Sequence, residues 1–189
     1  MSKTSLTTAT DAVRIFDAED MRRALRRIAH EIIERKRDLS ALILAGIPAR
    51  GVDLARRIAA EIETIEKVRV ATGVIDVSMH RDDHGTRTGV PVVRASQLPL
   101  PLEGRTVIIV DDVLFTGRTC RAAMDALGSF GRPACIQLAA LIDRGHRELP
   151  IRPDFVGKNL PTARAERVRV RLESLDHEAD GVWLLKPNE

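Results

Sequence analysis

One segment constrains the fold more than any other: a short aliphatic run that ends in two acids and a turn of small residues. Residues 107–110 are Val-Ile-Ile-Val, Asp111 and Asp112 follow, and residues 116–119 are Thr-Gly-Arg-Thr. A continuous aliphatic run between polar segments is typical of a strand buried on both faces, as in a parallel sheet. Ligands of open α/β sheets bind at the carboxyl ends of the strands. The segment therefore predicts both a parallel sheet and a binding site at its edge.

Segments with strand-like and helix-like patterns alternate along the rest of the chain, which favours a doubly wound α/β domain. Asp17 and Asp20 have the spacing of a capping box at the start of the first helix. Further helices are expected over 52–63 and 119–130, and strands over 42–45, 68–77, 106–110, 134–141, 154–156, 167–172 and 183–185. We expect a mostly parallel twisted sheet flanked by helices, with 183–185 closing it.

The same patterns predict the domain organisation. The Ser- and Thr-rich start predicts a flexible tail over residues 1–15, followed by a single domain over 16–189. Residues 80–97 are polar and charged and include two glycines, so we expect a flexible loop long enough to have a function, here called the hood loop.

Composition narrows the classes of protein. Aromatic residues make up 3% of the 189 residues and there is no Tyr, which argues against proteins that stack nucleic-acid bases on aromatic platforms. The net charge of +3 does not by itself require a polyanionic partner. Cys120 and Cys135 lie in apolar stretches and are expected to be buried and reduced. With neither a signal peptide nor a membrane span in the pattern, we expect a cytoplasmic protein with no membrane partner.

The acids and the turn after the central strand suit a sugar phosphate. Residues 116–119 would direct backbone N–H groups and two hydroxyls to one place, where the helix dipole adds positive potential for a phosphate. Asp111 and Asp112 would repel a phosphate but can accept hydrogen bonds from the hydroxyls of a ribose. Neither of the two common nucleotide loops, G-x-x-x-x-G-K-[ST] or G-x-G-x-x-G after a strand, is present. The simpler alternative is that the two acids only cap the helix.

This segment resembles the ribose-phosphate binding motif of the type I phosphoribosyltransferases. Residues 141–162, LIDRGHRELPIRPDFVGKNLPT, look like the sequence signature of the bifunctional pyrimidine operon attenuation regulators and uracil phosphoribosyltransferases. The first helix, over 22–35, and the turn over 46–51 are similar to that family too. The resemblance covers nearly all of the chain after residue 15 and implies the type I phosphoribosyltransferase fold.

The resemblance implies a role for each matching residue in binding phosphoribosyl pyrophosphate (PRPP). Asp111 and Asp112 would bind the ribose hydroxyls, and together with Arg50 they are the expected catalytic residues. The pyrophosphate would lie against the turn at Arg50, with Arg81 of the hood loop able to reach it. Mg²⁺ would enter the site bound to PRPP, and Asp111 or Asp112 would contact it. The full set expected to bind PRPP or UMP is Ala49, Arg50, Gly51, Arg81, Asp111, Asp112, Val113, Leu114, Phe115, Thr116, Gly117, Arg118, Thr119, Arg144 and Val168.

One position bears on which base is used. Purine-specific relatives have an aspartate just before the Thr-Gly pair, and this chain has Phe115 there. A phenyl ring cannot transfer a proton, so the base would not be bound in the purine way. The resemblance implies uracil instead, bound near Asp143 and Arg144, with Val168 lining the pocket. A purine-salvage phosphoribosyltransferase is the alternative that Phe115 argues against.

A second function is expected on the first helix. On a helical wheel, Arg23, Arg26, His30 and Arg37 fall within about 40° of the pole opposite the apolar face, Arg27 lies close by, and Glu34 interrupts them. A solvated helix face is the ordinary interpretation. The family resemblance instead implies a surface for an mRNA leader hairpin, formed by Arg23, Arg26, Arg27, His30 and Lys158. Arg167, Arg169 and Arg171 are a competing basic surface, which we interpret as the outer face of an edge strand.

The sequence therefore predicts a regulator of pyrimidine genes that responds to UMP or UTP and also makes UMP and pyrophosphate from uracil and PRPP. A homodimer or higher oligomer is expected from the resemblance. A regulator that senses UMP with a vestigial catalytic site is the alternative, and the intact motif at Asp111, Asp112 and 116–119 argues against it.

Overall fold

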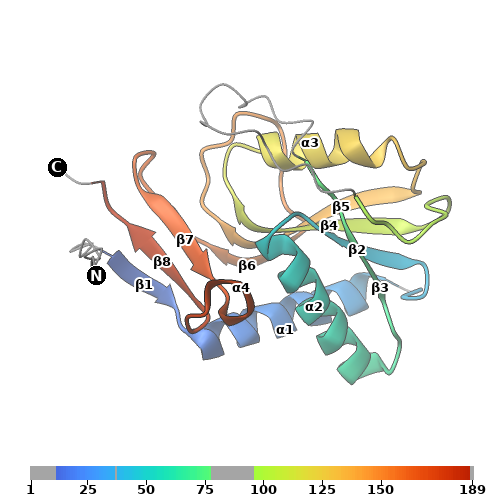
Figure 1. Cartoon of the computed structure of the whole chain (residues 1–189), viewed down its shortest axis with the longest axis horizontal. Helices are drawn as coiled ribbons and strands as arrows, with labels where there is room; N and C mark the ends of the chain where they lie inside the picture. Colours follow the sequence, from blue (N-terminus) through green and yellow to red (C-terminus); the bar gives the residue numbers. More distant parts are fainter. Residues whose placement is uncertain (1–11, 37, 78–95, 188–189) are drawn as a thin grey trace, which may run out of the picture.

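A five-stranded parallel sheet forms the centre of the molecule. The computed structural model describes residues 12–36, 38–77 and 96–187 (Figure 1). The strands follow the order β3-β2-β4-β5-β6, and each pair in the sheet is parallel. Their bounds are β2 Leu42–Gly46, β3 Ala71–Val74, β4 Thr106–Leu114, β5 Cys135–Asp143 and β6 Phe155–Asn159. The predicted α/β fold with a parallel sheet is confirmed.

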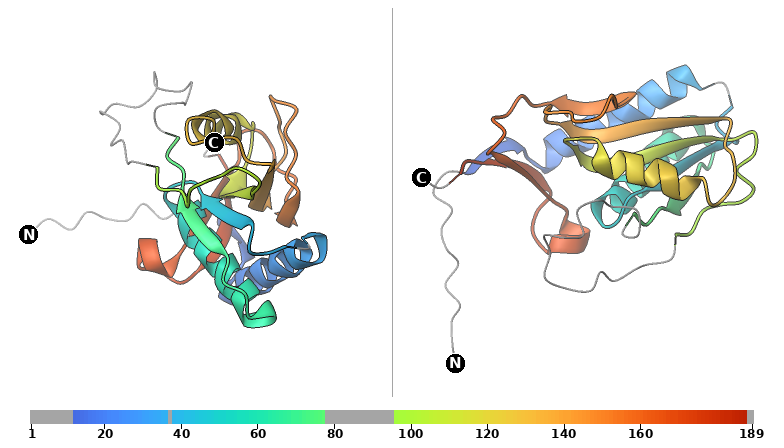
Figure 2. Two further views of the ribbon diagram at one scale, coloured as in Figure 1. Left: turned by 90° about the vertical axis from the view of Figure 1, so that its right-hand side faces the viewer. Right: turned by 90° about the horizontal axis from the view of Figure 1, so that it is seen from above.

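Helices cover both faces of this sheet, because alternate side chains of each strand point to opposite faces. On one face, α1 (Ala18–Arg35) and α2 (Arg50–Glu66) pack on Leu42, Leu44 and Ile108. On the other face, α3 (Arg118–Leu127) packs on Ile43, Val107 and Ile109. Figure 2 shows α3 on the side of the sheet opposite α1 and α2. The two apolar layers are almost entirely aliphatic, as the shortage of aromatic residues predicts.

The first helix begins as its sequence predicts. Asp17 accepts a hydrogen bond from the backbone N–H of Asp20 at 2.8 Å, and Asp20 accepts one from the N–H of Asp17 at 3.2 Å. This reciprocal capping box satisfies two N–H groups that the helix itself cannot. The buried residues of α1 repeat at helical spacing and include Met21, Leu25, Ile28 and Ile32.

Both ends of the described chain meet in a second, three-stranded antiparallel sheet. Its order is β1-β8-β7, with β1 Ala12–Phe16, β7 Arg167–Arg171 and β8 Gly181–Leu185. The short helix α4 (Glu173–Asp176) joins β7 to β8. The expectation that 183–185 closes the main sheet is wrong, since β8 pairs only with β1 and β7 among the described strands.

Two further expectations need correction. Residues 12–15 of the expected tail belong to β1 and pair with β8, whereas residues 1–11 lie outside the described residues. Cys120 is buried as predicted, but Cys135 is exposed at the start of β5, where the strand leaves the core. Residues 16–189 as a single domain stay a prediction.

Candidate functional site

The acid pair lies on β4 at the carboxyl end of the parallel sheet. The strand was expected to end at Val110 but continues to Leu114, because Asp111 pairs with Ala140 and Leu114 with Asp143 on β5. Asp111 and Asp112 are therefore held by strand backbone and not by a loop. Asp111 Oδ1 accepts a hydrogen bond from the N–H of Asp112, and Asp112 Oδ1 accepts one from the N–H of Val113, both at 2.9 Å. The two half-buried carboxylates have fixed positions at the edge of the sheet.

The turn after β4 leads into α3 and suits a phosphate. Gly117 has φ +93°, a conformation that glycine adopts at little cost. Gly117, the N-cap residue of α3, has no side chain to cap it, the first turn contains no acid, and the N–H of Arg118 lies 3.4 Å from Thr116 Oγ1. Backbone N–H groups at the start of such a helix are the usual donors to a bound anion. The carbonyl of Thr116 accepts hydrogen bonds from the N–H groups of Glu148 and Leu149, at 3.0 and 3.2 Å, which hold the turn in place.

A second helix start lies beside the acid pair. The N–H of Ile47 donates to the carbonyl of Val110 at 3.0 Å, so the turn after β2 is held against β4. A Cβ atom added to Gly51 would lie 2.3 Å from the same carbonyl oxygen, which explains a glycine at this point. Ala49 provides no side-chain cap for α2. α2 and α3 thus lie on opposite faces of the sheet, and both begin near the end of β4 that contains Asp111 and Asp112.

Arg50 and Asp112 line one cavity of about 460 Å³, together with residues of β7 that include Val168. Arg50 Nη2 donates to Asp176 Oδ1 at 2.6 Å, and its buried Nε has no partner among the described residues. Burial raises the pKa of Asp112 above its ordinary value, and the nearby positive charge of Arg50 acts in the opposite direction. The cavity therefore joins two of the three predicted catalytic residues, Arg50 and Asp112, to Val168, the predicted pocket residue.

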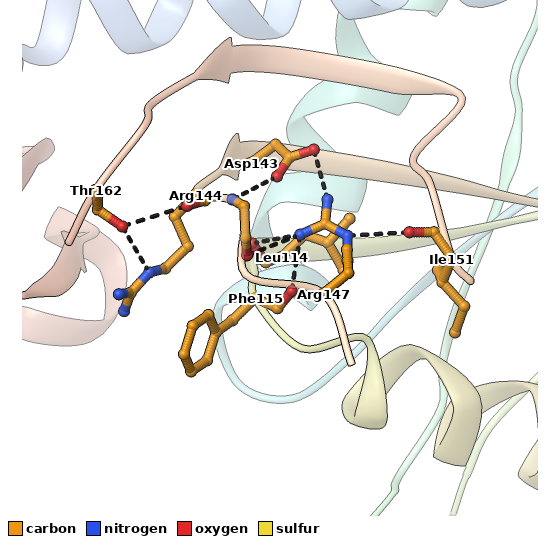
Figure 3. Close-up of polar contacts among 8 residues, drawn as sticks. Leu114, Phe115, Asp143, Arg144, Arg147, Ile151 and Thr162 are labelled. Carbon is orange, nitrogen blue, oxygen red and sulfur yellow. Dashed lines mark hydrogen bonds and ion pairs between the residues drawn. The ribbon is translucent and has the colours of Figure 1, made fainter. Parts of the chain in front are cut away.

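Arg147 joins the segment after β5 to the end of β4. It is not among the expected site residues. Its Nη1 donates to the carbonyl of Phe115 at 2.7 Å, its Nε to the carbonyl of Ile151 at 3.0 Å, and its Nη2 to Asp143 Oδ2 at 2.5 Å (Figure 3). One side chain thus fixes the segment after β5 to the end of β4. The sequence signal was present in the family signature, where Arg147 stands four residues after Asp143.

The guanidinium of Arg144 is buried against Phe115 and Thr162. Only 6% of the residue is exposed, and its guanidinium lies 4.1 Å from the ring centre of Phe115. Its Nε donates to Thr162 Oγ1 at 3.2 Å, as Figure 3 shows. The ring of His146 meets Phe115 edge-on at 6.0 Å, and its Nε2 lies 2.6 Å from the carbonyl of Thr162. Arg144 and His146 therefore hold the segment after β6 against Phe115.

The basic face of α1 is less uniform than the helical wheel indicates. Arg26 and His30 are exposed and make no hydrogen bond or ion pair with any residue that the structure describes. Arg23 pairs with Asp20 at 2.6 Å, so part of its charge is neutralised. Arg27 donates to the carbonyl of Gly157 on β6. Within the described part of α1, Arg26 and His30 are therefore the members of this face without such a partner.

Two other expected residues can be placed only in part. Lys158 is exposed on β6, with Nζ 5.8 Å from the ring centre of Phe16. Arg81 and most of the hood loop fall in 78–95, outside the described residues. Within the described ranges, no three metal-ligating side chains gather into a site, and no helix is long and apolar enough to cross a membrane.

Comparison with known proteins identifies similar sequences along most of the chain. Residues 11–172 match the model of the phosphoribosyl transferase domain. The bifunctional protein PyrR of Roseiflexus sp. (strain RS-1) is 59% identical over 173 residues, which cover 92% of this chain and 94% of the relative. The bifunctional protein PyrR of Chloroflexus aurantiacus is 57% identical over 169 residues, covering 89% and 91%.

Solved structures show a similar fold at much lower identity. A hypoxanthine phosphoribosyltransferase from Staphylococcus aureus matches with a TM-score of 0.70 at 19% identity, covering 98% of this chain and 97% of the other. That of Trypanosoma cruzi matches with a TM-score of 0.68 at 20% identity, covering 93% and 97%. At these identities the likeness extends to the fold and not to the base that is used.

Proposed function

This chain belongs to the phosphoribosyl transferase domain family and to the bifunctional PyrR proteins within it, and we propose that it joins two functions. One is the transfer of a phosphoribosyl group from PRPP to uracil, which yields UMP and pyrophosphate. The other is regulation of pyrimidine genes by binding an mRNA leader hairpin in response to UMP or UTP. We further propose that it acts in the cytoplasm as a homodimer or higher oligomer.

One observation supports the transferase proposal above all others: Asp111 and Asp112 lie on β4 next to the starts of α2 and α3, whose N-cap residues, Ala49 and Gly117, provide no side-chain cap. PRPP has an anionic group at each end of a ribose. Thr116, Gly117, Arg118 and Thr119 would bind the 5-phosphate at the start of α3. Ala49, Arg50 and Gly51 would bind the pyrophosphate at the start of α2, with Arg81 of the hood loop added. The carboxylates between them would accept hydrogen bonds from the ribose hydroxyls.

The reaction replaces one bond at the anomeric carbon by another. A ring nitrogen of uracil forms a bond to that carbon and the bond to the pyrophosphate oxygen breaks. The proton of that nitrogen passes to the released pyrophosphate or to water. Positive charge develops on the sugar, where the carboxylates of Asp111 and Asp112 lie, and negative charge develops on the leaving group, where Arg50 lies. Charged groups that the fold already holds in position stabilise such a transition state without any rearrangement of the protein.

Mg²⁺ fits this site as an ion carried by the substrate. The described residues contain no three-ligand cluster of their own, but the carboxylates of Asp111 and Asp112 are hard oxygen donors beside the expected pyrophosphate. The ion would be held by one of them together with phosphate oxygens, and it would supply charge neutralisation for the leaving group.

The base pocket is expected beside Phe115 and Arg144, with Val168 reaching it from the cavity that Arg50 and Asp112 line. Phe115 stands where purine-specific enzymes have an aspartate, and its ring is covered by Arg144 at 4.1 Å. Leu114, which continues β4, and Val113 complete the segment that leads to the phosphate turn. No proton donor of the purine type occupies this position, which supports uracil over hypoxanthine.

The regulatory half rests on the exposed face of α1. Arg26 and His30 are the exposed members without a partner among the described residues, and Arg23, Arg27 and Lys158 flank them. Arg and His on a helix can contact RNA phosphates and base edges without aromatic stacking.

The direct test of the transferase is release of pyrophosphate from PRPP with uracil, hypoxanthine or orotate as the acceptor. Turnover with uracil alone is expected, and turnover with hypoxanthine would make the chain a purine-salvage enzyme. Gel shifts with a pyrimidine leader RNA, run with and without UMP, test the regulatory half. UMP is expected to tighten the RNA complex, and by linkage RNA must then tighten UMP binding by the same factor. A protein that binds UMP and RNA but does not turn over would instead be a sensor.

A further inference from the structure

The outer face of β7 contains three arginines whose environments differ. Arg167, Arg169 and Arg171 alternate with Val168 and Val170, and Val170 is buried. Arg171 forms an ion pair with Glu178 and lies 5.2 Å from the ring centre of Trp183. Arg167 and Arg169 are exposed and have neither an ion pair nor a hydrogen bond with the described part of the chain. Two positive charges on this strand are therefore not neutralised by described residues.

These arginines border the same cavity as Arg50 and Asp112, two of the predicted catalytic residues. The cavity of about 460 Å³ is lined by Arg50 and Asp112 and by all five residues of β7. Two of its cations already have carboxylate partners, since Arg50 pairs with Asp176 and Arg171 with Glu178. Of the lining charges that remain, Arg167 and Arg169 lie on β7, and Asp112 lies on β4. The cavity therefore has an excess of positive charge on its β7 wall.

If Arg167 and Arg169 served only to prevent pairing of this strand with another sheet, they would not need to line this cavity. Arg14 on β1 provides the comparison, because Arg14 and Arg169 both stand opposite Trp183 on β8 and so share one face of the antiparallel sheet. Arg14 is exposed as well, but it does not line the cavity. The position of β7, and not the face of the sheet alone, brings Arg167 and Arg169 to the site.

We propose that Arg167 and Arg169 bind the pyrophosphate group of PRPP from the β7 side of the cavity that Arg50 and Asp112 line. This inference rests on the proposed transferase function. The start of α3 accounts for the 5-phosphate and the acid pair for the ribose hydroxyls, so the remaining anionic group is the pyrophosphate beside Arg50. Guanidinium groups match phosphate oxygens with two parallel donors and stay charged at every relevant pH. The two β7 arginines are binding residues for the substrate and for the product pyrophosphate.

Calorimetry with inorganic pyrophosphate and Mg²⁺ tests this on the full chain. The double variant Arg167→Ala/Arg169→Ala is expected to bind pyrophosphate about tenfold or more weakly, the usual order for loss of charge-assisted hydrogen bonds. In steady-state assays its KM for PRPP rises by a similar factor, while kcat and the affinity for UMP, which lacks pyrophosphate, stay near wild type. Arg14→Ala is the matched control and should change none of these values. Lysine at both positions should restore part of the affinity.

The outcomes separate this inference from the proposed function. If wild type transfers phosphoribose to uracil and the double variant keeps its pyrophosphate affinity and KM, the inference is wrong and the transferase function stands. If the double variant loses RNA affinity but not pyrophosphate affinity, the β7 arginines are RNA contacts and the inference is wrong. If wild type binds neither PRPP nor pyrophosphate, the proposed function itself fails. Equal thermal unfolding temperatures of the variants and wild type would confirm that folding is intact.

Discussion

The guanidinium of Arg50 is held by the carboxylate of Asp176, with Arg50 Nη2 lying 2.6 Å from Asp176 Oδ1. Two further contacts join the same segments, because Ser174 Oγ donates to Asp53 at 2.6 Å and Arg57 pairs with Asp180. The connection between β7 and β8 is thus fastened to the start of α2. A pyrophosphate group at Arg50 would have to share this guanidinium with Asp176.

Replacing Asp176 by Asn should therefore strengthen pyrophosphate binding. The variant removes a competing negative charge, while the amide oxygen can still accept the hydrogen bond that Leu172 N–H now gives to the carboxylate. We expect the Kd of Mg²⁺-pyrophosphate to fall about two- to fivefold, in line with the ~0.5–1 kcal/mol of a partly exposed ion pair. Ser174→Ala, which cuts a neighbouring contact without changing a cavity charge, is the control. Weaker binding by Asp176→Asn would mean that the carboxylate positions Arg50 and does not compete for it.

Gly51→Ala should damage the pyrophosphate turn. The added Cβ would lie 2.3 Å from the carbonyl oxygen of Val110, and that backbone cannot move without shifting β4. We expect a loss of about 1–3 kcal/mol in the free energy of unfolding and a rise in the KM for PRPP. Urea unfolding and initial rates measure the two effects. Gly128→Ala, where the nearest atom is 3.3 Å away and the backbone is right-handed helical, should behave nearly as wild type.

Asp112→Asn should separate stability from activity. Burial raises the pKa of Asp112 above 3.8, so the folded protein holds this proton more tightly than the unfolded chain does. The favourable contribution is complete below pH 3.8 and is lost as the pH rises through the raised pKa. Asn does not titrate, so the variant should gain stability relative to wild type as the pH rises from 4 to 8.

Turnover by the same variant should nevertheless fall about 10²–10³-fold, because an acceptor for a ribose hydroxyl is weakened. Unfolding in urea across that pH range, together with rates at pH 8, measures both effects. Asp125→Asn, on the exposed side of α3, should alter neither. A constant stability difference between Asp112→Asn and wild type at every pH would contradict the expected titration.

Arg147→Lys tests the contacts by which Arg147 joins the segment after β5 to the end of β4. An ammonium group can keep the ion pair with Asp143 but cannot also donate to the carbonyls of Phe115 and Ile151. We expect about 1–3 kcal/mol lower stability, since buried carbonyls lose their donor, and higher KM values for both uracil and PRPP. Thermal unfolding and steady-state kinetics provide the measurements. Arg152→Lys, at an exposed position of the same segment, should have no effect on either.

The arginines of α1 should differ in their effect on RNA. Arg26→Ala and His30→Ala remove exposed groups and should each weaken leader RNA binding by roughly 1–3 kcal/mol at a specific contact. Arg23→Ala should cost less, because Asp20 already neutralises part of that charge. Gel shifts at several salt concentrations check this, with uracil transfer as the control for folding. Equal RNA affinity for Arg26→Ala, His30→Ala and wild type would leave α1 as a solvated face.

The local sequence pattern was sufficient to predict the strand, the helix cap and the turn that are determined by adjacent residues. The buried run at 107–110, the capping box of Asp17 and Asp20, and the phosphate turn at Gly117 each depend on a few adjacent residues. These segments lie where the pattern placed them. The extension of β4 to Leu114 was missed, because Asp111 and Asp112 are poor strand formers and only pairing with β5 keeps them extended.

Contacts between distant residues could not be predicted in this way. Arg147 binds the carbonyl of Phe115, 32 residues away, and Arg50 binds Asp176, 126 residues away. Neither pair has a spacing that marks it. The run 183–185 has the apolar character of a closing strand, but that character does not say which sheet it joins. The exposure of Cys135 likewise depends on where β5 leaves the core.

The antiparallel sheet determines when its strands can pair during synthesis of the chain. β1, the first described strand, pairs with β8, the last, and β7 reaches this sheet only through β8. During synthesis from the N-terminus, β1 must wait with unpaired backbone groups while the parallel sheet forms behind it. A nascent chain stopped before residue 181 would contain the acid pair and the phosphate turn, but β7 would have no strand to hold it. The proposed contacts of Arg167 and Arg169 with pyrophosphate therefore depend on synthesis of β8, although both arginines precede it in the chain.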